Sequence, residues 1–441
     1  MTTFIPDQFQ EAQPSGMMLF SLPPTQTAVE RIFYQEVRPI SQTSGNAPIE
    51  FVISGQNGME YMDLKKSKLF VKVRITHADG SKLLDTEYVG PINLLLQSMF
   101  SQVDVTLQGK TVTSTTNHYL YKCMIETLLS FGLDAKESQL TSQLFQKDSN
   151  GHFDDSDVNS GQNMGLYMRS KHFEANKSVD LEGPLMADLF SMDRFILNQV
   201  AVGIRLYRSK GEFCLMTNEL GPDFRVHIED IILKVCKLQV NPAVIYGHSV
   251  IMKTNPALYP YTRTEVKMMA IPAGQVNFTW DNMFQGIRPN KLVIGFVDSE
   301  AVAGPYSKNP FNFQHFDLSS LTLYIDNLPV GGNALRLNFD DKNGVSSVSA
   351  FANMFEITGK WGTDSGNQLS REDFAEGNAL YCFDIEPNFE SNIHYLTLLK
   401  QGNARIEAHF NKALEQTTTC IVYATFPSLF SITGARDVVL E

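Results

Sequence analysis

The sequence contains residue types that can act as nucleophiles, but their spacing does not match a known catalytic arrangement. Ser365 stands in the run Thr-Asp-Ser-Gly-Asn at 363–367, which could present a hydroxyl group at a turn. A serine nucleophile needs a base within hydrogen-bond reach and a third group that orients this base. None of the nine histidines is paired with Ser365 by sequence, and no Gly-x-Ser-x-Gly motif is present. We therefore predict a surface turn here and no catalytic residue in the chain.

Residue types that bind metals are equally dispersed. The acidic run that begins at Asp155 is similar to the start of a calcium loop, but an EF-hand needs Gly at position six and Glu at position twelve. Counted from Asp155, these positions hold Ser160 and Leu166. The histidines and cysteines lack the spacing of zinc ligands, and the glycine-rich phosphate-binding motifs are absent. The sequence therefore predicts a solvated loop at 155–161, no metal site and no cofactor.

The overall charge indicates which partners the chain can have. Its 441 residues carry a net charge of −12, and the pI is near 5.3. Binding to nucleic acid depends on Lys and Arg side chains that meet phosphates, so we expect no specific nucleic-acid binding. The densest basic cluster, at Lys65, Lys66 and Lys68, fits a solvated loop or a contact between subunits.

Cysteine use and the start of the chain predict a protein that is not secreted. The five cysteines include no Cys-x-x-Cys pair, which is typical of reduced thiols packed in a core rather than of a disulfide framework. The first basic residue is Arg31, so the positive segment of a signal peptide is missing. No apolar run reaches the roughly 18 residues that a membrane-spanning helix needs. We therefore expect an intracellular protein.

Most of the sequence has the pattern of β-strands. Residues 1–26, with four prolines and one short apolar cluster, are predicted to form an irregular arm. Beyond the arm, apolar residues alternate with other residues at 69–75, 103–107 and 200–206. This period of two is typical of strands with one buried face, and it makes Leu107 a predicted core residue.

Two short helices are predicted to interrupt the strands. Asn117 is suited to cap the first and Gly132 to end it, and its apolar residues at helical spacing are Leu120, Met124, Leu128 and Phe131. The second is expected near 345–358, with the apolar residues Val348, Phe351, Ala352 and Phe355. The polar segment 133–178 is too long for a structureless loop, so we predict a surface excursion with short elements of its own.

The second half of the chain repeats the order of segments found in the first half. Segment 103–112 aligns without a gap with 321–330, at an offset of 218 residues, which makes Ile325 the counterpart of Leu107. Shorter matches keep the same order: 67–69 with 290–292, 91–94 with 310–313, 180–182 with 384–386, and 213–215 with 419–421. Because ordered matches indicate duplication, we predict two similar units that meet near Asn241 and Pro242.

Each unit has room for about eight short strands and one helix on a connection. Eight antiparallel strands in two facing sheets form a jelly roll. The predicted fold is therefore all-β, with two tandem eight-stranded jelly-roll barrels and a short helix on a connection of each. The expected parts are an N-terminal arm at 1–26, a first jelly roll at 27–240 and a second at 241–441.

Short motifs beside the predicted strands are shared with one protein family. They are Tyr-Met-Asp-Leu at 61–64, the run from 228 to 242, Tyr-Pro-Tyr-Thr-Arg at 259–263, the run from 282 to 289, and Asn-Pro-Phe-Asn-Phe at 309–313. These segments resemble double jelly-roll major capsid proteins, most closely those of Polinton/Maverick elements and adintoviruses. The resemblance spans about residues 29–440.

This resemblance implies a structural, hexon-like capsid protein rather than an enzyme. It implies a homotrimer whose six barrels form a pseudo-hexameric capsomer, and capsomers that tile an icosahedral shell together with penton or minor capsid proteins. It places the chain in the virion capsid, after assembly in the nucleus or cytoplasm of the host cell, and leaves contact with a membrane open. The chain is short for a eukaryotic-virus member, so modest outer loops are expected.

Two other classes of function remain open at the level of the sequence. Jelly rolls also serve as lectins, so a glycan-binding or adhesin module is the alternative to a capsid subunit. An enzyme on a cupin-like barrel would need clustered His and carboxylate ligands, which the sequence lacks. A stable trimer, or larger sheets and shells, would favour the capsid subunit over both.

Overall fold

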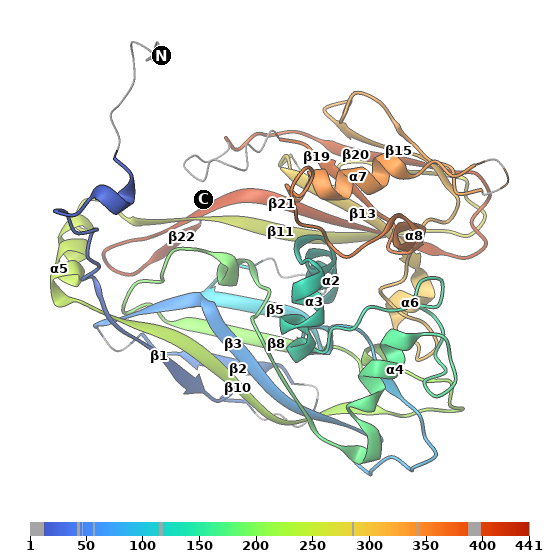
Figure 1. Cartoon of the computed structure of the whole chain (residues 1–441), viewed down its shortest axis with the longest axis horizontal. Helices are drawn as coiled ribbons and strands as arrows, with labels where there is room; N and C mark the ends of the chain where they lie inside the picture. The colour runs from blue at the N-terminus through green and yellow to red at the C-terminus, as the bar shows by residue number, and fades with distance from the viewer. Residues whose placement is uncertain are drawn as a thin grey trace.

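The computed structural model of the chain describes residues 13–41, 45, 47–55, 58–113, 118–284, 286–340, 342, 344–386 and 398–440. These residues form two β-sandwiches, one above the other in Figure 1, with short helices between and beside them. Among the described residues, no helix is both long and apolar enough to cross a bilayer.

The first sandwich is built from two four-stranded sheets. One sheet has the order β1 (Val29–Val37), β10 (Arg225–Val240), β3 (Glu60–Thr76) and β7 (Val179–Gly183). The facing sheet has the order β2 (Ile49–Ile53), β8 (Val202–Arg208), β5 (Phe100–Leu107) and β6 (Lys110–Thr111). The short strands β4 (Gly90–Pro91) and β9 (Leu215–Met216) pair beside them.

The second sandwich draws its strands from the second half of the chain. One sheet has the order β11 (Ala257–Ile271), β21 (Thr418–Ile432), β13 (Lys291–Asp298) and β19 (Leu380–Asp384), and β22 (Val438–Leu440) pairs with β21. The facing sheet has the order β12 (Asn277–Trp280), β20 (Ala404–Phe410), β15 (Leu318–Ile325) and β16 (Leu328–Pro329), and β17 (Leu335–Arg336) pairs with β15. The short strands β14 (Phe313–Gln314) and β18 (Glu376–Gly377) form a separate pair.

Both sandwiches arrange their strands in the jelly-roll order. In one sheet of each, the first strand pairs with the last long strand, which in turn pairs with the third. β5 and β15 hold the same place in the other sheet, and both have eight residues with the same succession of buried and partly exposed positions. Both shift register near their first residue and end in a two-residue turn with positive φ, Gln108–Gly109 and Asp326–Asn327. The match of 103–112 with 321–330 is therefore a match in structure.

One shorter match falls on equivalent strands in a different register. Residues 180–182 lie on β7 and Asp384 ends β19, and each strand pairs with the third strand of its sandwich. Lys68 and Lys291 are matched residues on the third strands of the two barrels. When these strands are superposed, Asp384 lies opposite Lys291 but falls four residues away from the position that the match with Asp180 requires. This prediction of register is wrong, because short acidic and apolar segments resemble one another by composition.

The alternating residues predicted as core are buried. Leu69, Val71 and Val73 on β3, and Leu107 and Ile325 at the ends of β5 and β15, all face the interior. Asp104 departs from the expected polar outer face of β5, since it is buried and its carboxylate accepts a hydrogen bond of 2.9 Å from Gln102.

The two predicted helices lie on corresponding connections. α2 (Tyr119–Ser130) follows β6, and α7 (Val348–Glu356) precedes β19. Three residues predicted for the apolar face of α2 are buried, namely Leu120, Met124 and Leu128, whereas Asn117 lies outside the described residues. The other helices are α1 (Leu95–Ser98), α3 (Leu133–Glu137), α4 (Met164–Lys171), α5 (Pro242–Ile251), α6 (Ser299–Ala303) and α8 (Arg371–Ala375).

The predicted buried face of α7 is wrong. Val348 is exposed and Phe351 is only partly buried, whereas Ala350 and Met354 are fully buried. The small alanine and the adaptable methionine let the helix lie close to its neighbours, and the Phe351 ring instead packs at its side against Phe374, with 6.3 Å between ring centroids. Because Phe351 is partly buried by another aromatic ring, it does not have to lie on the side of the helix that faces the sheet.

Residues 133–178 are not the surface excursion that the sequence predicts. They contain α3, α4 and turns of 3-10 helix, as expected, but several of their polar residues, such as Asp148 and Arg169, are fully buried between the segment and the two barrels. Residues 13–26 of the predicted arm are all exposed, and Ser15–Met17 form one turn of 3-10 helix. Residues 1–12 of that arm lie outside the described residues.

Candidate functional site: the polar junction between the two barrels

The residues that the sequence suggested for chemistry are held within their own loops. The Ser365 hydroxyl lies 2.9 Å from that of Thr363 in an exposed turn. The Asp155 carboxylate accepts the backbone N–H groups of Asp157 and Gln162 at 3.1 and 2.6 Å, so this loop folds around the carboxylate rather than simply being solvated. Across the described ranges, no group of three His, Cys, Asp or Glu side chains is placed to hold a metal ion.

The basic cluster at 65–68 is neutralised locally. Its three lysines lie 2.6–3.7 Å from carboxylates: Lys65 from Asp193, Lys66 from Asp63 and Lys68 from Glu182. Exposed pairs of this kind contribute little to stability, but they reduce the positive potential that phosphates would meet. The cluster therefore gives no support to nucleic-acid binding.

The densest group of buried polar side chains lies where 133–178 passes between the barrels. Arg169 on α4 and Asp148 are both fully buried and form an ion pair at 2.7 Å. The Arg169 Nε and Nη1 atoms donate to the backbone carbonyl groups of Pro91 and Gln146, at 2.8 and 2.7 Å. Because a buried charge is costly unless its donors are satisfied, this geometry fixes α4 against the first barrel.

A close backbone approach brings Asp148 to Arg169. Asn163 caps α4 by accepting the backbone N–H of Leu166 at 3.2 Å. In the first turn of the helix, a Cβ atom added to Gly165 would lie 2.4 Å from the carbonyl oxygen of Lys147. Only glycine lets the helix touch the segment that carries Asp148, which then lies beside the next turn of the helix.

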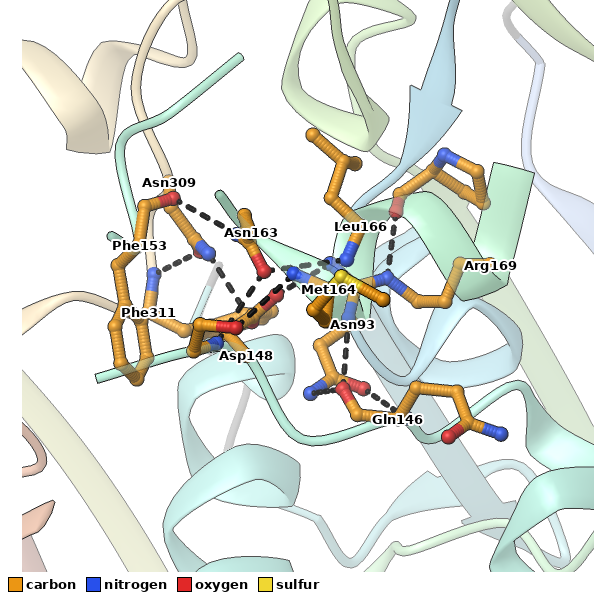
Figure 2. A network of polar contacts seen from close by, with 12 residues as sticks. Asn93, Gln146, Asp148, Phe153, Asn163, Met164, Leu166, Arg169, Asn309 and Phe311 are labelled. Atoms are coloured by element: carbon orange, nitrogen blue, oxygen red, sulfur yellow. Dashed lines mark hydrogen bonds and ion pairs between the residues drawn. The ribbon is translucent and has the colours of Figure 1, made fainter. Parts of the chain in front are cut away.

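The second barrel reaches the same carboxylate from another side, as Figure 2 shows. The buried Asn309 donates through Nδ2 to Asp148 at 3.2 Å, and its backbone N–H donates to Asp154 at 2.8 Å. Asn312 donates to the other oxygen of Asp154 at 2.7 Å. Burial raises the pKa of Asp154, and these donors counteract part of that effect.

The internal repeat gives the first barrel a corresponding contact. Asn93 lies in the segment 91–94, which matches 310–313, and its counterpart in the second barrel is Asn312. The Asn93 side chain donates to the carbonyl oxygen of Gln146 at 2.7 Å and accepts the Gln146 N–H at 3.0 Å. The matched segments of both barrels therefore hold the same excursion.

A second buried cluster joins α2 to the sheet of β11 and β21. Lys122 lies 3.0 Å from Asp188 and 3.4 Å from Glu126. The Tyr423 hydroxyl donates to Glu126 at 3.0 Å, and the Thr264 N–H donates to Asp188 at 3.0 Å. Burial raises the pKa of Glu126, whereas for Lys122 the two carboxylates outweigh burial and raise its pKa.

Two lysines tie the end of α2 to the second barrel. The buried Lys136 donates to the carbonyl oxygens of Leu128 and Asn367 at 3.0 and 2.6 Å. Lys360 donates to the carbonyl oxygens of Ser130 and Gly366, at 2.8 and 3.1 Å. Cations are favourable at a helix C-terminus, but burial and the neighbouring Lys360 lower the pKa of Lys136 to about 7.

In these clusters the charged groups are partners of one another or of backbone carbonyls. They fix two barrels in one arrangement, and this is the feature of the molecule that we take as its functional site. Sequence reasoning missed Asp148 and Arg169, because they lie 21 positions apart and the chain between them has no single period. The only signal was the pair of matched asparagines, Asn93 and Asn312, in the repeated segment.

The chain matches one curated protein and many solved structures. No known protein-family profile matches it. A protein of Caenorhabditis elegans, described as the uncharacterized protein F54H12.2, is 23% identical over 438 residues, which cover 95% of this chain and 99% of that protein.

Three of the similar solved structures are of viral origin. The Sputnik virophage structure has a TM-score of 0.63 at 11% identity, with 100% of this chain and 94% of that chain covered. The PBCV-1 virus capsid has a TM-score of 0.59 at 10% identity, with 96% and 98% covered. The Faustovirus major capsid protein has a TM-score of 0.54 at 9% identity, with 95% and 93% covered. The chain therefore has the all-β, double jelly-roll fold of solved viral capsid proteins.

Proposed function

We propose that this chain is a major capsid protein, a hexon-like structural subunit without catalytic activity. The observation that carries the proposal is the match of the whole chain, both barrels together, to capsid structures such as that of PBCV-1. The buried junction supports it. A shell subunit has to keep a fixed shape while neighbours press on both barrels. The hydrogen bond of Asn309 in the second barrel to Asp148, which Arg169 holds in place, resists rotation of one barrel against the other.

Electron microscopy of the purified protein tests this proposal. Hexagonal capsomers, sheets or closed shells are the expected result. A protein that stays monomeric at every concentration and is retained on a glycan column would instead favour the glycan-binding alternative.

We further propose a homotrimer in which six barrels form a pseudo-hexameric capsomer. Within one chain, Glu126 of the first barrel contacts Tyr423 on the outer face of the second-barrel sheet. In the internal repeat, β10 and β3 are the counterparts of β21 and β13. Their outer face is therefore the surface of the first barrel that corresponds to the Tyr423 surface of the second barrel. There Glu229 lies 3.9 and 3.4 Å from Lys72 and Arg74, and the three side chains stay 25–49% exposed. A threefold axis would place the second barrel of the next copy on this face and close the ring.

Charge reversal on this face tests the arrangement. The double variant Lys72→Glu, Arg74→Glu should dissociate the trimer, because a permanent interface on the order of 2,000 Å² cannot accommodate repulsive charges within it. Lys82→Glu, at an exposed position in the loop after β3, is the control. Analytical ultracentrifugation distinguishes the outcomes: a monomeric wild type contradicts the trimer, and a trimeric double variant contradicts this face.

Finally, we propose that the chain belongs to the Polinton/Maverick and adintovirus group. The similarity to an animal protein over 99% of that protein's length supports an element carried in a cellular genome. Sequencing the DNA on both sides of the gene tests this, since cellular chromosomal flanks are expected.

We also expect penton or minor capsid proteins as partners and a location in the virion after assembly inside the host cell, which immunoelectron microscopy would check.

A further inference from the structure

One end of the molecule exposes apolar side chains on two adjoining segments. α5 contains no Asp, Glu, Lys or Arg and has no buried residue. The arm carries the apolar side chains Phe20 and Leu22, which are 100% and 91% exposed. The Asn241 N–H donates to the carbonyl oxygen of Ala28 at 2.9 Å, so the arm leaves the body beside the start of α5, at one end of the molecule (Figure 1).

A cavity lies beside the other end of α5. Its volume is about 440 Å³. Its lining is mostly apolar, with Ile251, Met252, Leu258 and the rings of Phe195 and Tyr259, and it also includes Asp193, Arg194 and His248. Tyr259 is fixed, because its hydroxyl donates to the carbonyl oxygen of Phe195 at 3.1 Å. This volume and this lining suit a few apolar side chains.

The charge pattern of the arm and of α5 favours a protein occupant over a bilayer. Residues 12–29 contain no charged side chain, and α5 contains none either. Helices and segments that bind membrane surfaces usually combine apolar residues with Lys or Arg on a polar side. A chain with a net charge of −12 is also repelled by anionic lipid.

The arm is built to extend away from its own body. Pro23 and Pro24 restrict the backbone to extended conformations between the apolar cluster at 17–22 and Ala28. The ten residues of α5 span about 15 Å. The eight steps of chain from Phe20 to Ala28 reach about 26 Å when extended, which is further than α5 is long. Phe20 and Leu22 are uncovered in the single chain, which leaves them free to bind a second copy.

We propose that the apolar cluster at 17–22 of one copy docks into the α5 cavity of a second copy. This inference rests on the proposed capsid function, because it names a contact that links neighbouring subunits of the shell. Burying Phe20 and Leu22 would cover the most exposed apolar side chains of the arm and fill the cavity with matching chemistry.

Disulfide trapping tests the contact. All five native cysteines are buried, so cysteines introduced on the surface are the reactive ones. Phe20→Cys and Ile251→Cys chains, assembled together and oxidised, should give a disulfide-linked pair of full-length chains on a non-reducing gel. Leu220→Cys replaces Ile251→Cys in the control, because Leu220 is fully exposed and precedes the start of the 16-residue strand β10, far from α5. No linked pair, or an equal yield with Leu220→Cys, would overturn the proposal.

A second measurement separates this inference from the capsid proposal. Phe20→Ser and Ile251→Asp should each leave the trimer intact and reduce the yield of particles at least tenfold, whereas Val52→Asp, at a similarly exposed site on β2, should not. Normal particles from the first two variants would refute the docking while the capsid function stands. Wild-type protein that never assembles would refute both. The intact protein can also be tested for flotation with phosphatidylcholine–phosphatidylserine vesicles. If the wild type floats with the vesicles and Ile251→Asp does not, this end of the molecule binds a bilayer and the docking proposal is wrong.

Discussion

Leu107 and Ile325 show what the internal repeat means for single residues. They end the equivalent strands β5 and β15, and they pair across the sheet with Val202 and Ala404. Their exposed fractions are 0% and 5%, so each lies in the core of its own barrel. The two barrels therefore offer a matched pair of positions at which core packing can be measured.

We expect Leu107→Ala and Ile325→Ala each to lower the free energy of unfolding by about 2–5 kcal/mol, through lost burial and the cavity left behind. Ser365→Ala, in an exposed turn, should stay within about 0.5 kcal/mol of the wild type. Denaturant titration of the three variants checks this. Core variants as stable as Ser365→Ala would show that these positions do not hold the barrels together.

Arg169 should be far more sensitive than its charged neighbour on the same helix. Arg169→Met leaves the Asp148 carboxylate buried without its cation, which costs about 3–5 kcal/mol. Lys171→Met removes an exposed ion pair with Glu174 and a contact of the ammonium group with the Tyr167 ring, so it should lower the stability far less. If urea midpoints of the two variants coincide, the junction does not carry the stability that we assign to it.

At the scale of elements, a histidine ties the end of β3 to the segment before β10. His77 lies 2.6 Å from Asp223 and 3.1 Å from Glu87. The hydrogen bond to Asp223 is the largest cause that raises the pKa of His77. The charged histidine is therefore favoured in the folded state, and the tie is strongest when His77 is protonated.

This predicts a definite direction of pH dependence. Because the folded-state pKa of His77 is raised, its contribution is fully present below the unfolded value of about 6.5 and is lost as pH rises through the folded value. The melting temperature of the wild type should therefore exceed that of His77→Gln most at pH 5.5, and the difference should shrink by pH 8.5. A difference that grows with pH would contradict this assignment.

The elements that the sequence predicted correctly are those with a simple spacing. Alternation marked β3, β5 and β8, and the repeat located α2 and α7 on corresponding connections. Spacing alone did not identify the buried face of α7, because Phe351 finds an aromatic partner at the side of the helix. Nor could it place 133–178, since the partner of Asp148 in the second barrel, Asn309, is 161 residues away. Such contacts depend on tertiary packing, which leaves no period in the sequence.

At the scale of the whole molecule, the junction makes the two barrels one cooperative unit. Arg169, Asp148 and Asn309 share one buried network that neither barrel satisfies alone. We therefore expect a single unfolding transition in calorimetry, with the van't Hoff and calorimetric enthalpies equal. In Arg169→Met the transition should separate into two. Two well-resolved transitions in the wild type would mean that the barrels unfold independently.

We expect the arm to contribute to assembly and not to folding. Residues 13–26 are exposed along their length, so their removal exposes no core. A chain that lacks residues 1–26 should keep its melting temperature and its trimer, and it should form few closed particles. Circular dichroism, ultracentrifugation and electron microscopy check the three statements, and normal particles from the truncated chain would refute the last.

The buried thiols have a consequence for the capsid function that we propose. All five cysteines are buried and unpaired, and burial raises the pKa of Cys214 to about 12, so the reactive thiolate form is scarce. A shell of such chains presents no sulfhydryl group of its own to glutathione or to oxygen. It would pass from the reducing cytosol to the oxidising exterior and back without gaining or losing a covalent bond. Opening such a shell in the next cell would therefore require a trigger other than a change of redox potential.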